Sequence, residues 1–114
     1  MTTLNDVVNE AQTAAYSAAQ KFFAEKMNNV DGGCCGFAWV NLYKYNGKKL
    51  DGRSKMGKAL QSAGIRKDYY GGFQLWNPSK FPVQNVDTLE AGAEAAAQVF
   101  KKYGFEAYAG SRLD

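Results

Sequence analysis

The chain has 114 residues, of which 46% are hydrophobic and 22% charged, and it carries a net charge of +3. This length and composition predict one globular domain and exclude wholesale disorder. The sequence has no run of the ~18 to 20 apolar residues that a membrane span needs, and it does not begin with a secretion signal, so we expect a cytoplasmic protein without a membrane partner.

The first predicted element is a helix from Leu4 to Met27. Thr3 and Asp6 have the spacing of an N-terminal capping box, and apolar residues recur at helical intervals through an alanine-rich middle. Alanines allow another element to approach closely. We expect this helix, at about residues 4–27, to be an extension on a core formed by residues 35–114, with a role in packing, homodimer formation or partner binding.

Two adjacent cysteines, Cys34 and Cys35, follow a turn at residues 31–33. A disulfide between sequence neighbours is strained, and two thiols without any histidine make a poor zinc site. We therefore expect reduced, part-buried thiols and no metal or cofactor.

From Gly36 to Tyr45 the sequence alternates with a period of two, which predicts a strand with two different faces. Phe37, Trp39 and Tyr43 would project from one face, flanked by Tyr45. Aromatic side chains beside cations are a common support for single-stranded nucleic acid. The alternative is that the first helix covers this face and that the aromatic residues are core.

Further elements follow a turn at Asn46-Gly47. Residues 53–63 predict a short helix that is capped by Asp51 or Ser54 and ended by Gly64, and residues 72–76 predict a second strand. A third helix follows Asp87 and Glu90, which have the spacing of a capping box, and Lys101 and Lys102 lie at its C-terminal end. A last strand spans about residues 105–110, after a glycine cap at residue 104.

This order predicts a single α/β domain in which a three-stranded sheet is packed by three helices, with a βαβαβ core. Two consecutive strand-helix-strand units most simply give parallel strands with right-handed crossovers. The short connection between Ile65 and Gly72 could instead make one strand antiparallel, which would give an α+β fold.

The basic residues are concentrated in one window, from Lys44 to Asp68, which has a net charge of +6 between mildly acidic flanks. A local basic patch attracts anions more strongly than a uniform surface does. We expect this turn and helix to contact phosphate or nucleic acid, with Gly47, Gly52 and Gly57 permitting close backbone approach; the alternative is a solvated surface that confers solubility. The eight residues are Lys44, Lys48, Lys49, Arg53, Lys55, Lys58, Arg66 and Lys67.

Catalysis has little support in the sequence. There is no histidine and no serine in a G-x-S-x-G context, and the carboxylates have structural explanations as turn, cap and surface residues, so we expect no catalytic residues and no enzyme activity. A polar set would line a groove if its strands lay side by side. Its members are Asn41, Gln74, Asn77, Gln84, Asn85 and Arg112.

Four sequence motifs, CGFAWV at residues 35–40, YGG at 70–72, QNVDxxEA at 84–91 and AYAGSRLD at 107–114, together resemble small uncharacterised proteins of tailed bacteriophages. The resemblance covers residues 35–114 and not the first helix. It implies a phage origin and carries no activity.

Together these features predict a non-enzymatic phage accessory protein that binds nucleic acid through its basic turn and second helix, mainly through phosphates. Trp39 and Tyr43 would add stacking. The alternative is a protein-interaction module, either a virion component or an inhibitor of a host protein, that uses the first helix and exposed aromatic residues.

Overall fold

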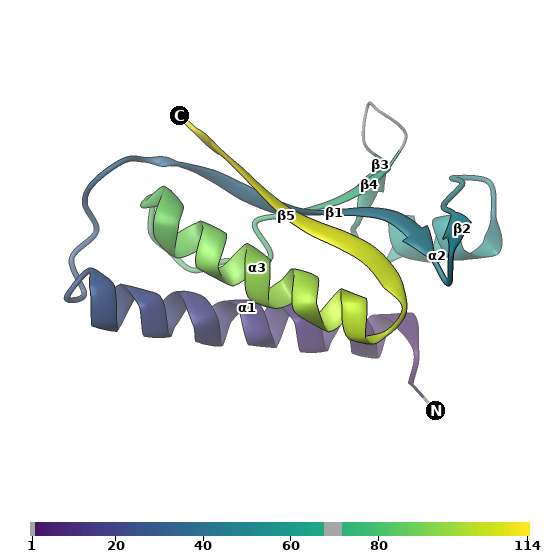
Figure 1. Cartoon of the computed structure of the whole chain (residues 1–114), viewed down its shortest axis with the longest axis horizontal. Helices are drawn as coiled ribbons and strands as arrows, with labels where there is room; N and C mark the ends of the chain where they lie inside the picture. The colour runs from purple at the N-terminus through teal and green to yellow at the C-terminus, as the bar shows by residue number, and fades with distance from the viewer. Residues whose placement is uncertain (1, 68–71) are drawn as a thin grey trace.

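The structure, a computed structural model, describes residues 2–67 and 72–114. These residues form three helices and five strands (Figure 1). The mixed α/β class is confirmed, with two short strands beyond the three expected. The elements are α1 (Leu4–Lys26), β1 (Gly36–Tyr45), β2 (Lys48–Lys49), α2 (Lys55–Ser62), β3 (Arg66–Lys67), β4 (Phe73–Trp76), α3 (Val86–Lys102) and β5 (Phe105–Leu113).

All strand pairs in the described residues are antiparallel, so the expectation of parallel strands was wrong. Strand β1 is central: β5 pairs along one side of it, while β4 and β2 pair along the other, with β3 outside β4. The reason lies in α3. A bridge between Cys35 and Asn85 fixes the start of α3 beside the start of β1, so α3 runs in the same direction as β1. The strand that follows α3, β5, must then run back in the opposite direction, antiparallel to β1.

Helices α1 and α3 lie on the same side of the sheet and run in opposite directions (Figure 1). The side chains of Ala38, Val40 and Leu42 point from β1 toward these helices and are buried. Helix α1 packs its alanine face on α3: a Cβ added at Gly92 would lie 3.0 Å from the carbonyl oxygen of Ala15. The apolar face of α1 therefore contributes to the core of its own chain.

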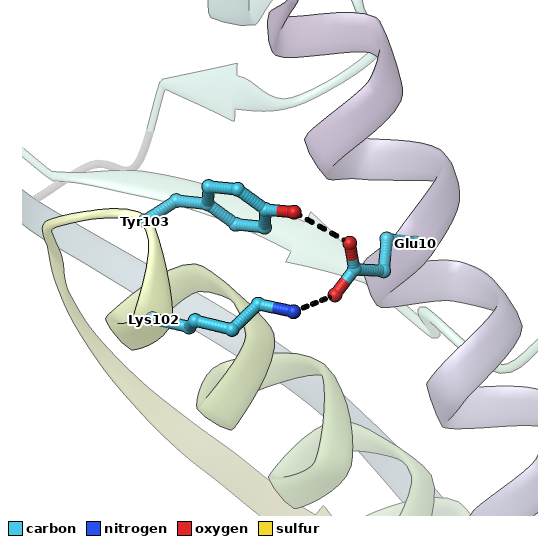
Figure 2. Close-up of polar contacts among 3 residues, drawn as sticks. All are labelled: Glu10, Lys102 and Tyr103. Carbon is cyan, nitrogen blue, oxygen red and sulfur yellow. Dashed lines mark hydrogen bonds and ion pairs between the residues drawn. The ribbon is translucent and has the colours of Figure 1, made fainter. Parts of the chain in front are cut away.

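A polar cluster on the surface joins the two helices (Figure 2). Tyr103 donates a hydrogen bond of 2.6 Å to Glu10, and Lys102 forms an ion pair with the same carboxylate. These contacts lower the pKa of Glu10, and the hydrogen bonds to Glu10 raise the pKa values of Lys102 and Tyr103. The cluster therefore stabilises the fold most between the ordinary pKa of the carboxylate and those of its two partners, and less at either extreme of pH.

The residues that cap α1 and α2 are among those that the sequence predicts as caps. Thr3 and Asp6 form the expected capping box of α1, and Ser54 caps α2 by accepting a hydrogen bond from the backbone of Gly57. At the other end of α2, Gly64 has a φ of 89° and the backbone N–H of Ile65 donates to the carbonyl of Leu60 at 3.0 Å. This is the predicted glycine-capped Schellman turn.

The cap of α3 differs from the prediction. Asn85, not Asp87, caps the helix: its Oδ1 accepts hydrogen bonds of 2.9 Å from both the backbone N–H and the hydroxyl of Thr88, and its Nδ2 donates to the carbonyl of Gly32 at 2.8 Å. Asp87 lies in the first helical turn, and Glu90 accepts a hydrogen bond from Ser111 instead of closing a capping box. An amide suits this position because its nitrogen donates to the loop before β1 while its oxygen accepts from Thr88.

We expect Asn85→Ala to lower the free energy of unfolding by about 2 to 3 kcal/mol, because it removes the cap and leaves the buried hydroxyl of Thr88 without its acceptor. Asp87→Ala should cost only about 0.5 kcal/mol, through the helix dipole. Urea denaturation of both variants measures the difference. A larger loss for Asp87→Ala would contradict this assignment.

Candidate nucleic-acid interface

The face of the sheet turned away from α1 and α3, here called the open face, carries aromatic side chains from three adjacent strands. No helix of the described residues covers this face (Figure 1). Its aromatic residues are each half-buried or exposed, and we call them the aromatic platform. They are Phe37, Trp39 and Tyr43 of β1, Trp76 of β4 and Tyr108 of β5.

The centre of the aromatic platform is a pair of stacked indoles. Trp39 and Trp76 are opposite each other across β1 and β4, and their rings are parallel within 3° with centroids 5.2 Å apart. The ring of Phe37 lies 5.7 Å from that of Trp76, and the guanidinium of Arg112 lies 5.6 Å from the centre of Phe37. Trp76 remains 45% exposed, so much of its ring is accessible to a ligand.

Two tyrosines extend the aromatic platform. The ring centroids of Tyr43 and Tyr108 lie 6.0 Å apart, and the ammonium of Lys101 lies 5.6 Å from the ring centroid of Tyr108. The hydroxyl of Tyr108 donates to Glu106 at 3.0 Å, and this hydrogen bond to a carboxylate raises the pKa of Tyr108. The phenol thus stays a neutral donor near neutral pH.

The sequence located the β1 aromatics on one face, and the alternative that α1 buries Phe37, Trp39 and Tyr43 is wrong. Tyr45 departs from the alternation: it points to the helix side, with its ring 4.7 Å from Phe105. A bulge between Leu42 and Lys44 causes this change, because the extra residue shifts the alternation by one.

Trp76 and Tyr108 also belong to the site, although they were not predicted from the sequence. The signal was present in each strand, since Phe73 and Leu75 alternate with Trp76, and Ala107 and Ala109 flank Tyr108. What the sequence does not contain is the pairing that brings β4 and β5 to either side of β1.

The eight cations of the basic window are all exposed, and three of them lie on the open face. Lys44 is opposite Lys49 in the β1–β2 ladder, and Arg66 is opposite Gln74, which is itself opposite Asn41 on the open face. Residues directly opposite each other in a ladder point to the same face.

The other five cations have different positions. Lys48 is opposite Tyr45 and so points to the helix side, and the side chain of Lys67 lies close to Gly52 in the loop after β2. Arg53, Lys55 and Lys58 lie on the loop and helix α2 beyond it. The residues of the basic window thus gather at one end of the molecule and do not form one flat face (Figure 1).

These cations are not neutralised by ion pairs within residues 2–67 and 72–114. The ion pair found there joins Lys102 to Glu10, away from the basic window. The glycines of the window have structural roles: Gly47 forms the hairpin turn with a φ of 79°, and a Cβ at Gly57 would lie only 1.9 Å from the carbonyl of Asp51.

An open hollow of about 550 Å³ borders the aromatic platform, lined by Gly64, Arg66, Gln74 and Trp76. Gln74 donates to Asn41 at 3.4 Å on the same face.

The six polar residues predicted to share a groove do not form one site. Asn41, Gln74 and Arg112 are on the open face, whereas Asn85 is the cap of α3. Asn77 forms a turn with a φ of 45°, and Gln84 accepts a weak hydrogen bond of 3.5 Å from Cys35.

Both cysteines are free and exposed, which corrects the expectation of part-buried thiols. In the described ranges, no three acidic, cysteine or histidine side chains converge in a way that could hold a metal ion.

Of the helices in residues 2–67 and 72–114, none is both long enough and apolar enough to span a membrane. Asp68, one of the two acids of the basic window, lies outside the described residues.

Comparison of the chain with protein-family models, with curated proteins and with solved structures finds no match.

Proposed function

We propose that this protein binds single-stranded nucleic acid on the open face of its sheet and has no enzymatic activity. The observation that carries the proposal is the stacked pair Trp39 and Trp76, accessible on an uncovered sheet with cations beside it. Bases of a single strand are free to stack on exposed rings, whereas those of a duplex are stacked on one another.

The aromatic platform supplies the contacts to bases. Stacking of one base on an aromatic side chain contributes about 1 to 3 kcal/mol and is tolerant of sequence. Trp76 and Tyr108 are the most accessible rings of the aromatic platform, with 45% and 49% of their surfaces exposed. They offer separate stacking positions on β4 and β5, on either side of Trp39.

The cations supply the contacts to phosphates. Lys44 and Lys49 lie at one end of the aromatic platform and Arg66 at its β3 edge, within reach of a backbone whose bases rest on the rings. The exposed cations of α2 and its loop add positive potential that accelerates association. Most of the affinity would come from phosphate contacts and stacking, so sequence preference would be weak. The resemblance to small tailed-phage proteins suggests a role during infection, inside the host cytoplasm.

Intrinsic fluorescence tests the proposal directly, because the two tryptophans of the chain are both in the aromatic platform. We expect an oligothymidylate or oligouridylate to quench this fluorescence. The logarithm of its binding constant should fall with the logarithm of salt concentration by about 0.7 per phosphate contacted. Duplex DNA of equal charge should bind more weakly and quench less.

Inorganic polyphosphate is the matched control, because it offers the charge of a strand without bases. Equal affinity and equal quenching by polyphosphate would reduce the site to a general anion patch and contradict base stacking. Absence of binding to any single strand at low salt would reject the proposal.

A protein-binding role is the second candidate, because exposed aromatic rings on a sheet are also common in protein interfaces. Tyr16 of α1 and Val30 of the loop after it, 44% and 64% exposed, provide further apolar surface for a host or virion protein. Purified protein that carries no nucleic acid, shows no salt-dependent binding to it and retains one defined protein partner would favour this role.

A further inference from the structure

The outer edge of β5 is the largest unpaired edge of the sheet in the described residues. This nine-residue strand pairs with β1 along one side, and no other described strand pairs with its second side. In Figure 1, β5 crosses in front of β1, and no other element is drawn in front of it. Natural proteins usually protect such an edge with proline, charged side chains, a bulge or a short strand, because it is a template for another strand. β5 has no proline, the bulge of this ladder lies in β1, and the charged side chains of β5 are Glu106 and Arg112, which have opposite signs.

We propose that two copies of this chain pair antiparallel through β5, with Ala109 of each copy at the two-fold axis. In an isologous dimer, a residue on one side of the two-fold axis pairs with the residue that lies the same number of positions beyond the axis in the second copy. With Ala109 on the axis, Glu106 lies opposite Arg112 of the second copy, and Arg112 lies opposite Glu106 of the second copy. The strand is thus complementary in charge to itself in this register.

The backbone hydrogen bonds are compatible with this register. Gly104 and Asp114 both bond to β1: the carbonyl of Gly104 accepts from Asn46 at 2.9 Å, and the N–H of Asp114 donates to the carbonyl of Cys35 at 3.0 Å. Along an antiparallel strand, successive residues direct their backbone groups to alternate sides. Odd-numbered residues of β5 therefore direct their N–H and C=O groups outward, and pairing about Ala109 joins odd to odd.

Side chains also agree with this pairing. Even-numbered residues form the non-hydrogen-bonded pairs, in which side chains lie closest, so Glu106 and Arg112 would be in direct contact. Tyr108 would lie opposite the second copy's Gly110, where its ring would meet the indole of that copy's Trp39, which occupies the space over Gly110. On the helix side, Leu113, 64% exposed in the single chain, would lie opposite Phe105 of the second copy.

Two features of the chain make the edge accessible. Helix α1, whose apolar face already packs on α3, lies toward the β4 side: its residues Gln12 and Tyr16 line a hollow with Ser79 and Lys80 of the loop after β4. Lys101 reaches from α3 to the ring of Tyr108, and this exposed side chain can turn into solvent when a second strand approaches. The dimer would have all four long helices on one face and both aromatic platforms on the other.

Charge reversal with complementation tests the register. Sedimentation equilibrium between about 5 and 500 μM should show a dimer for the natural chain. Glu106→Arg and Arg112→Glu should each weaken it at least tenfold, because each places like charges opposite each other twice. Mixing the two variants should restore the dimer, since one chain then offers two arginines and the other two carboxylates at the facing positions.

Glu25→Lys and Lys21→Glu, on exposed positions of α1, make the same changes in charge away from β5 and serve as the control. Neither should weaken the dimer. Circular dichroism of each variant confirms folding, and Ala109→Pro provides a second disruption, by removing the N–H at the axis. A natural chain that stays monomeric throughout this range, or single variants that dimerise like the natural chain, would overturn the proposal. These outcomes are independent of nucleic-acid binding, which is measured separately.

Discussion

Replacing Trp76 by alanine is expected to lower the affinity for a single-stranded oligonucleotide by about 5- to 150-fold, the equivalent of one lost stacking contact of 1 to 3 kcal/mol. Trp76 is the most exposed member of the indole pair and lies in contact distance of both Trp39 and Phe37. The loss should be similar at low and high salt, because stacking does not release counterions. Fluorescence anisotropy of a labelled oligonucleotide measures both affinities.

Tyr16→Ala is the matched control for this variant. Tyr16 is as exposed as Trp76, at 44%, and also packs against an aromatic neighbour, with its ring 5.3 Å from that of Phe81, but it lies on α1. Its removal should leave affinity unchanged within about twofold. Equal losses for the two variants would mean that binding does not use the open face.

Reversing the three cations of the open face, Lys44→Glu with Lys49→Glu and Arg66→Glu, should lower affinity on the order of 100-fold at 0.1 M salt. The slope of log affinity against log salt should fall by about 2, since three phosphate contacts are lost. All three side chains are exposed and form no ion pair within the described residues; since Lys44 is opposite Glu106 in the β1–β5 ladder, circular dichroism of the variant checks that the fold is kept. Anisotropy titrations across a salt series give both quantities.

A second triple variant shows whether the loss of affinity depends on where the cations lie or only on the net charge. Lys48→Glu with Lys55→Glu and Lys58→Glu changes the net charge equally, but these residues point to the helix side or lie on α2. We expect this variant to lose less than tenfold in affinity, through weaker steering alone. A loss as large as that of the open-face variant would show that the whole basic end of the molecule binds the strand, as the sequence predicts for its turn and second helix.

Local signals in the sequence were sufficient for most of the secondary structure. The Thr3 cap, the Gly64 turn and the alternation from Gly36 each depend on neighbours within a few residues, and each appears in the fold. The cap of α3 was missed because Asp87 and Glu90 also have the spacing of a capping box, and the contact that holds the Asn85 amide in place, to Gly32, joins residues 53 positions apart. Strand direction was missed for the same reason, since the Cys35–Asn85 bridge that sets it is not local.

The candidate site was predictable in its parts and not in its assembly. Alternation identified Trp39 and Tyr43, but the two-residue strands β2 and β3 are too short to give a periodic signal of their own. Their pairing decides that Lys49 and Arg66 lie beside the aromatic platform while Lys48 does not. The bulge after Leu42 adds a change of phase that an alternating pattern cannot reveal.

Position 110 of β5 sets a limit on sequence variation in this protein. A Cβ at Gly110 would lie 2.5 Å from Nε1 of Trp39, so the indole occupies the space that any other side chain would need. Alanine there would tilt the ring and separate it from Trp76, although a strand accepts alanine without difficulty. A surface residue with no side chain thus governs the arrangement of the two tryptophan rings. We expect substitutions at residue 110 to reduce ligand binding more than they reduce thermal stability.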